Sequence, residues 1–302
     1  MQHPDAQIPV RLKYSIDLEY EVRVADSDFI FNVQAACTRN QQVLQERLEL
    51  SPQLPALGYT DPATCARYLR LRASPGLLHL HYDAVVDITH YHADPAPLQE
   101  VRISDLPGHV LPYLYPSRYC ESDRLHRFAV AQFGMLWRGY SRVQAIRDWV
   151  WNQVMFMSNS TSGTTSACDT LVEKRGVCRD FAHLMIALCR AVNIPARFTT
   201  GIDYGADASL GPQDFHAYVE VYVGHRWFMF DPSGTAIPMG FIRMATGRDA
   251  AEAAFASIFG NVAMQAPVLR IDAVPGADGV CRLPVHTADA LSTDDGIIAG
   301  FQ

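Results

Sequence analysis

Two kinds of hydrophobic pattern divide the chain. Up to residue 92, apolar and polar residues alternate in short runs, at 12–24, 29–35, 42–50, 65–71 and 77–88. Asp, Ser, Pro or Gly bounds each run, and short strands at this spacing predict an antiparallel β-sandwich or barrel. Residues 93–118 contain five prolines, which indicates a connection between domains.

Beyond residue 118 the pattern takes the period of helices. Helices are predicted at 122–133, 141–157, 167–174 and 178–192, and strands at 196–204, 214–223 and 226–231, with weaker ones near 267–274 and 279–286. We therefore expect a β-rich accessory domain over 1–110, an α+β domain over 111–290 and a C-terminal tail over 291–302.

The composition is that of a folded, acidic chain. The 302 residues are 49% hydrophobic and 19% charged, with a formal net charge of −7, as in packed globular domains. An acidic chain is poorly suited to nucleic acid or an anionic membrane, so we expect neither partner. The first residues do not show the basic segment followed by an apolar segment that marks a secretory signal peptide. No run of 18 apolar residues occurs, so we expect no transmembrane helix.

Seven cysteines, an odd number, leave at least one thiol unpaired within the chain. None lies in a CxxC pair, which excludes a zinc ribbon and a thioredoxin-type motif on spacing. Free thiols persist in a reducing cytoplasm. We therefore expect a cytoplasmic protein, and we expect neither a cofactor nor a metal.

Cys178 opens the clearest helix of the chain. At 100° per residue it shares an apolar stripe with Phe181 and Cys189, while Asp180 and His183 fall on the opposite, polar side. Unpaired N–H groups and the dipole at a helix N-terminus favour a thiolate and offer donors to an oxyanion. A buried cysteine is also often a small core residue, which is our interpretation of Cys189.

A histidine and an aspartate come together on a predicted hairpin. Two alternating runs, 214–223 and 226–231, are separated only by a glycine and a histidine, which suits a type II′ turn. The register of this turn places His216 and Asp231 on one face as diagonal neighbours, roughly 7–8 Å apart. A structural histidine on a half-buried strand fits the same pattern.

Several ordered strings carry a resemblance to a known family. They are Gly176-Val-Cys-Arg-Asp-Phe-Ala-His183, Ile194-Pro-Ala-Arg197, Asp214-Phe-His-Ala-Tyr-Val-Glu220 and Trp227-Phe-Met-Phe-Asp231, with Pro116-Ser-Arg-Tyr-Cys-Glu-Ser-Asp123 upstream and Gly247-Arg-Asp-Ala-Ala251 downstream. From about Leu111 to Gly260 the chain resembles the transglutaminase-like superfamily of papain-type thiol enzymes. It is most similar to the bacterial branch named transglutaminase-like putative cysteine proteases.

The resemblance implies an α+β fold, with a papain-like transglutaminase core of helices packed on an antiparallel sheet behind the β-sandwich or barrel domain. It implies that Cys178 attacks an amide carbonyl to form a thioester acyl-enzyme. His216 would accept the thiol proton or form a thiolate–imidazolium pair with Cys178, and Asp231 would orient the imidazole and stabilise its positive charge. The backbone N–H of Cys178 is the expected first oxyanion donor.

The sequence leaves several choices open. The second oxyanion donor is unassigned among Trp149, Trp151, Asn152 and Gln153. We favour hydrolysis of a peptide or protein amide, because the resemblance is to a protease-like branch and no calcium loop is evident. A protein-glutamine transamidase and a non-catalytic binding module of the same fold are the alternatives. The oligomeric state is open.

Two histidine pairs lie in the β-rich half. They are His79-x-His81 and His90-x-His92, with Asp83 and Asp87 between them. In a strand each pair projects to one face, an arrangement that metal sites use, but surface or core histidines fit equally and we expect no metal. GxSxG, GxxxxGK and HExxH are absent, so residues 158–166 are expected to form a loop bordering the cleft.

Overall fold

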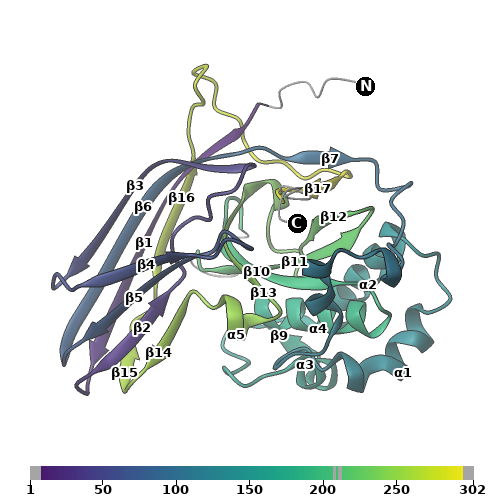
Figure 1. Cartoon of the computed structure of the whole chain (residues 1–302), viewed down its shortest axis with the longest axis horizontal. Helices are drawn as coiled ribbons and strands as arrows, with labels where there is room; N and C mark the ends of the chain where they lie inside the picture. The colour runs from purple at the N-terminus through teal and green to yellow at the C-terminus, as the bar shows by residue number, and fades with distance from the viewer. Residues whose placement is uncertain (1–7, 207–208, 210–212, 295–302) are drawn as a thin grey trace.

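The computed structural model describes residues 8–206, 209 and 213–294, which form two domains (Figure 1). The strands of the first domain are β1 Val10–Val22, β2 Ser27–Phe31, β3 Gln41–Ser51, β4 Ala56–Thr60, β5 Arg67–Ala73, β6 Gly76–Ile88, β14 Ala256–Phe259, β15 Val262–Met264 and β16 Val268–Ala273. One sheet has the order β15-β1-β6-β3, with β16 also on β1, and the other has the order β14-β2-β5-β4. The predicted antiparallel β-sandwich is confirmed.

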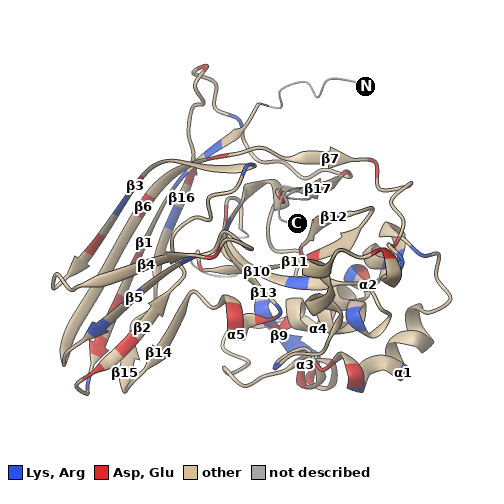
Figure 2. Cartoon of the chain, in the orientation of Figure 1, with Lys and Arg blue, Asp and Glu red and all other residues tan. Residues whose placement is uncertain are grey.

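Alternation along the strands builds this sandwich. In β1 and β6 every second side chain is buried, so one face of each strand enters a core that includes Tyr14, Tyr20 and Tyr82. The outward faces carry charges of both signs (Figure 2), some of them paired across strands, as in Arg11 with Asp87 at 2.7 Å. Solvent on one face and core on the other is the usual condition of an antiparallel sheet.

The end of the chain returns to the first domain. Strands β14 to β16 pair with β1 and β2, although the prediction placed these residues in the 111–290 domain. Residues 279–286 form no strand, and the first part of the predicted 291–302 tail is β17 Ala290–Ser292, paired with β7 Tyr91–Ala93. Residues 295–302 lie outside the described part. Pairing between distant strands leaves no local signature, which is why these assignments were wrong.

The second domain packs helices on a four-stranded antiparallel sheet, as expected. Its elements are η1 Ile103–Asp105, η2 Gly108–Leu114, α1 Ser122–Phe133, α2 Tyr140–Gln153, β8 Met155–Phe156, α3 Ala167–Glu173, β9 Arg175–Gly176, α4 Cys178–Ala191, β10 Ala196–Asp203, β11 His216–Val223, β12 Arg226–Phe230, η4 Pro238–Gly240, β13 Phe241–Gly247 and α5 Ala250–Ala253. The sheet order is β12-β11-β10-β13. Helix α2 ends before the predicted residue 157, because β8 begins at Met155 and pairs with β9.

Helix α4 is amphipathic, as predicted, but both of its faces are buried. Asp180, His183 and Arg190 are at most 2% exposed. The Arg190 guanidinium donates to the carbonyl oxygens of Ala196 and Arg248. Burial lowers the pKa of His183 to about 3, so the ring is neutral and its Nε2 accepts from a backbone N–H. Partners supplied by surrounding segments therefore allow a polar helix face to be buried.

The hairpin of β11 and β12 has the predicted register but a different turn. Val223 pairs with Arg226 and Tyr222 with Trp227. Gly224 and His225 both have positive φ, at 55° and 62°, which is a type I′ turn rather than the predicted type II′. Both turns join two strands through two residues, so the register is the same.

Polar contacts join the sandwich to the four-stranded sheet of the second domain. The Gln41 side chain donates to the carbonyl oxygen of Arg243 in β13 and accepts from its N–H. Ile202 of β10 and Ile242 of β13 enter the sandwich core. Residues of both domains therefore contact β10 and β13 of this sheet.

No helix in the described ranges is both long and apolar enough to cross a bilayer.

Candidate active site

One end of the antiparallel sheet gathers the predicted site residues. His216 is the first residue of β11, and Asp231 directly follows the last residue of the neighbouring β12. Antiparallel neighbours start and end at the same edge, so these two side chains meet there. Cys178 is the first residue of α4, which packs against β10 and β11.

The distances within this group are short. His216 Nε2 lies 3.5 Å from Asp231 Oδ1, an ion-pair contact outside hydrogen-bond geometry. The half-buried Cys178 thiol lies 3.9 Å from the carbonyl oxygen of Phe215, the residue before His216. The structure therefore brings together all three side chains that the sequence singled out.

A tight turn holds the Asp231 carboxylate. Its Oδ1 accepts from the Ser233 N–H at 2.9 Å and from the Ser233 hydroxyl at 2.6 Å, while Oδ2 accepts from the Ala236 N–H at 3.0 Å. Burial raises the pKa of Asp231, but His216 and these donors outweigh it, so the pKa is lower than usual. Asp231 is therefore an ionised partner for the imidazole. The sequence pattern did not indicate this contact of Ser233.

A second carboxylate, which the sequence analysis also missed, lies on the other side of the ring. Asp203 ends β10, and its Oδ2 lies 3.7 Å from His216 Nδ1. Burial lowers the pKa of His216, but Asp203, Asp231 and a hydrogen bond with Cys178 raise it well above its ordinary value. The imidazole is therefore held in its charged form. The available signal was an aspartate at the end of the predicted strand 196–204.

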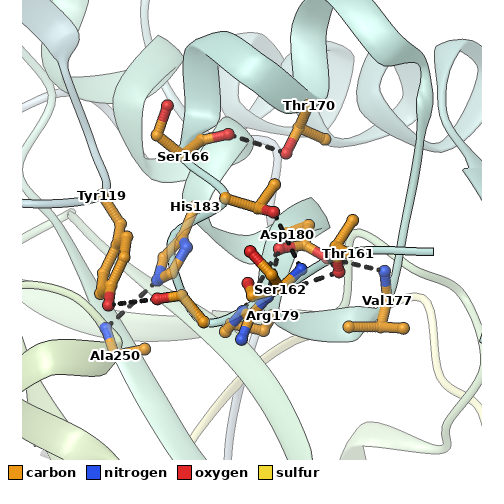
Figure 3. Close-up of polar contacts among 12 residues, drawn as sticks. Tyr119, Thr161, Ser162, Ser166, Thr170, Val177, Arg179, Asp180, His183 and Ala250 are labelled. Atoms are coloured by element: carbon orange, nitrogen blue, oxygen red, sulfur yellow. Dashed lines mark hydrogen bonds and ion pairs between the residues drawn. The ribbon is translucent and has the colours of Figure 1, made fainter. Parts of the chain in front are cut away.

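The entry into α4 explains the residues around Cys178. The Asp180 carboxylate accepts from the Val177 N–H at 2.9 Å and from the Thr161 hydroxyl at 2.6 Å (Figure 3). Arg179 donates to Asp180 and to the carbonyl oxygen of Ser162, which lies in the loop of residues 158–166. This loop therefore contacts the first turn of α4, the turn that begins with Cys178.

Glycine is required just before this helix. A Cβ on Gly176 would lie 2.7 Å from the Cβ of Asp180, closer than two carbons pack. Because residue 176 has no side chain, the Asp180 carboxylate can fold back and accept from the Val177 N–H at the start of the helix.

The other cysteines differ from Cys178 in their surroundings. Cys189 is fully buried in the core, as predicted, and burial raises the pKa of its thiol. Burial also raises the pKa of Cys120 to about 12, and Cys168 is partly buried near the start of α3. All seven thiols are free. Among them, Cys178 is the thiol that contributes to the raised pKa of His216.

The four candidates for a second oxyanion donor lie in different places. Trp149 packs edge-on against Phe128, Asn152 donates to a carbonyl oxygen of its own helix, and Gln153 lines a separate cavity with Phe128. Trp151 is 52% exposed and lines a cavity of about 710 Å³ whose wall also includes Asp231. Of the four candidates, Trp151 is therefore the one that lines the same cavity as a residue of the site.

The histidine pairs of the first half have protein partners. His79 and His81 both contact Asp17 Oδ1, at 3.2 and 2.8 Å. His92 Nδ1 lies 2.9 Å from Asp289 Oδ2, and His90 is buried. Within the described residues no group of three or more potential ligands is arranged to hold a metal.

Comparisons with known proteins match both domains. Residues 134–232 match the model of the transglutaminase-like superfamily, and residues 10–109 match that of the bacterial transglutaminase N-terminal domain. A solved protein from Cytophaga hutchinsonii, described as a "putative cysteine protease", is 38% identical with a TM-score of 0.87, and the alignment covers 94% of this chain and 97% of that chain.

Curated relatives from mycobacteria are also similar. An uncharacterised protein from Mycobacterium tuberculosis is 26% identical over 240 residues, which is 70% of this chain and 74% of that protein. An uncharacterised protein from Mycobacterium leprae is 31% identical over 112 residues, which is 35% of this chain. That match spans 40% of the length of the M. leprae protein.

Proposed function

Because the chain belongs to the transglutaminase-like superfamily, whose members are in general enzymes, we propose that it is a thiol-dependent amide hydrolase acting on peptides or proteins. The observation that carries the proposal is the meeting of Cys178, His216 and Asp231 at one end of the sheet. Cys178 is the first residue of α4. The backbone N–H groups in the first turn of a helix have no partners within the helix, so they are potential donors to an oxyanion.

Acylation uses each of these groups. Cys178 and His216 form a thiolate–imidazolium pair, in which the thiol proton lies on the ring, and the thiolate attacks the amide carbonyl carbon. The Cys178 backbone N–H donates to the resulting oxyanion. The C–N bond then breaks, the amine leaves with the proton from His216, and a thioester remains on sulfur. Asp231 keeps the ring oriented and stabilises the imidazolium throughout.

Water completes the cycle. His216 takes a proton from the water molecule as its oxygen attacks the thioester carbon. The C–S bond breaks, the carboxylic acid leaves, and the proton returns to sulfur. The raised pKa of His216 favours the imidazolium in the first half-reaction, and the ionised Asp231 supports it in both.

The cavity beside Asp231 is the proposed place for part of the substrate. Its volume of about 710 Å³ lies within the range of roughly 300–1,000 Å³ of pockets that bury drug-sized ligands. Tyr140, Trp151 and Phe230 supply apolar wall, and Arg147 and Gln144 supply polar groups. Such a mixed wall suits a short stretch of peptide.

Hydrolysis is favoured over amine transfer on one comparison. The solved relative from Cytophaga hutchinsonii, 38% identical, is described as a "putative cysteine protease". A protein-glutamine transamidase would use the same three side chains, with an amine in place of water. Incorporation of a fluorescent amine into a glutamine-bearing protein, measured beside peptide release, decides between the two reactions.

Labelling of the thiol tests the proposed nucleophile. An alkyne-iodoacetamide should label the native protein rapidly near neutral pH, and Cys178→Ala should lose this fast phase. Cys168→Ala is the matched control, because Cys168 is also partly buried near a helix start, where burial and Glu121 raise the pKa of its thiol. Equal, slow labelling of the native protein and Cys178→Ala would refute an activated Cys178.

We also propose that the protein works in the cytoplasm. The support is that its seven cysteines are free thiols, and such thiols persist in reducing compartments. Cell fractionation followed by detection of the protein tests this location.

A further inference from the structure

Asp203 is a buried carboxylate that has no role in the reaction proposed above. It is the last residue of β10 and is 2% exposed. Gly201, two residues earlier, pairs with His216 across the strands, so Asp203 reaches the ring from the diagonal position. Its Oδ2 lies 3.7 Å from His216 Nδ1, and its Oδ1 has no hydrogen-bond partner among the described residues.

An unpartnered carboxylate oxygen at this depth needs an explanation. Burial of a carboxylate without hydrogen bonds costs several kcal/mol in typical proteins, and natural cores rarely leave such a group unused. Asp231 is different, because a turn supplies it with three donors. Asp203 has the imidazole as its ionic partner, so its position makes sense through His216.

We propose that Asp203 is a positioning residue for His216, holding the ring from the Nδ1 side and stabilising its positive charge while Asp231 does so from the Nε2 side. This inference rests on the proposed function, in which His216 accepts the thiol proton. The two carboxylates come from strands on either side of β11, so the ring is clamped across three strands.

The other groups facing His216 come from several elements. Cys178 approaches from α4 and Tyr218 packs edge-on from the same strand, with ring centroids 4.9 Å apart. Asp214 lies in the segment before β11, where burial raises its pKa although the charge of His216 acts to lower it. The charges nearest the ring are therefore negative, and the imidazolium is the group that balances them.

The charge of Asp203 depends on pH. Burial raises its pKa to about 6, with His216 acting to lower it and Asp231 to raise it. Asp203 is thus ionised above about pH 6 and stabilises the imidazolium there. As the pH falls through about 6 this contribution is lost.

The direct test measures the titration of His216. Protein labelled with ¹³C at histidine Cε1 is prepared as Cys178→Ala, which removes the thiol from the titration, with and without Asp203→Asn. The His216 signal is assigned by its loss in His216→Gln. Removing a carboxylate at this distance should lower the pKa of His216 by about one to three units. Asp214→Asn is the matched control and should lower it by less.

A second measurement links Asp203 to the thiol. In the otherwise native protein, Asp203→Asn should slow iodoacetamide labelling of Cys178 at pH 7 by about tenfold or more, the effect of one pKa unit on the ion pair. Near-ultraviolet circular dichroism checks folding, and Asp203→Ser replaces a variant that does not fold.

The outcomes separate the two proposals. Fast labelling of the native protein with an unchanged His216 pKa and unchanged rate in Asp203→Asn overturns the role of Asp203 and leaves the proposed function standing. Slow labelling of the native protein, equal to that of Cys178→Ala, overturns the proposed function itself. A lower pKa of His216 and slower labelling in Asp203→Asn together support the clamp.

Discussion

Replacing Gly201 with alanine should destabilise the protein strongly, for a purely steric reason. Gly201 lies in β10, opposite a register shift in which β13 carries Met244 as an extra residue. A Cβ there would lie 1.9 Å from the carbonyl oxygen of Ile242 and 2.9 Å from the ring of Phe241. Its φ is outside the left-handed region, so alanine has no backbone penalty of its own at this position.

The size of the effect follows from this geometry. Real Cβ atoms essentially never approach other heavy atoms within 3.0 Å, so the backbones of β10 and β13 must separate by about 1 Å locally. Overpacking of a core costs about 1–3 kcal/mol, and weakened backbone hydrogen bonds beside it cost about 0.5–1.5 kcal/mol each. We expect a loss of about 3 kcal/mol in the free energy of unfolding, or roughly 6–12 °C in Tm.

Gly58 provides the matched control for this substitution. It also lies in a strand, β4, but a Cβ there meets nothing within 4 Å. Gly58→Ala should therefore change stability by less than about 1 kcal/mol. Urea unfolding followed by circular dichroism measures both variants. Two results would contradict this reasoning. Either Gly201→Ala unfolds at the same urea concentration as the native protein, or Gly58→Ala loses as much free energy of unfolding as Gly201→Ala. In either case the close packing of β10 on β13 is not what limits the residue at position 201.

Three further substitutions test other contacts. Ser233→Ala removes the buried hydroxyl that donates to Asp231 at 2.6 Å and should cost about 1.5–3 kcal/mol in urea unfolding, with slower labelling of the site thiol; native values of both would contradict the role of this turn. Thr161→Val removes the donor to Asp180 and should cost a similar amount while raising amide hydrogen exchange in the 158–166 loop, and unchanged exchange would argue against bracing. Burial lowers the pKa of His90 from 6.5 to about 4. Between these two pH values only the unfolded chain takes up the proton, so the free energy of unfolding falls as the pH drops, by up to about 3 kcal/mol. His90→Gln should make this fall smaller when the free energy of unfolding is measured at pH 7 and at pH 4.5.

Local patterns predicted most elements of this protein. Helix α1 begins and ends where the sequence indicated, and β6, β10 and β12 lie within a residue or two of their predicted bounds. These elements are set by periodicity and by turn residues, which act over a few positions. The hairpin register was predictable for the same reason, since a two-residue turn determines pairing whichever type it adopts.

Other predictions failed where distant segments decide the outcome. The sequence did not predict that the polar face of α4 is buried, which is possible because carbonyl oxygens of residues 196 and 248 accept from Arg190. Strands 256–259, 262–264 and 268–273 join the first domain, because its sheet edges at β1 and β2 accept them. Nothing within a short window records such pairing.

The candidate site shows the same division. The sequence by itself determined that Cys178 opens a helix, that His216 opens a strand and that Asp231 ends the next one, because periodicity and turn chemistry are local. Only the tertiary structure decided that β10 runs beside β11 and thereby brings Asp203 within 3.7 Å of the imidazole. Burial of both side chains at this end of the sheet then strengthens their electrostatic interaction, since few water molecules remain to screen the charges.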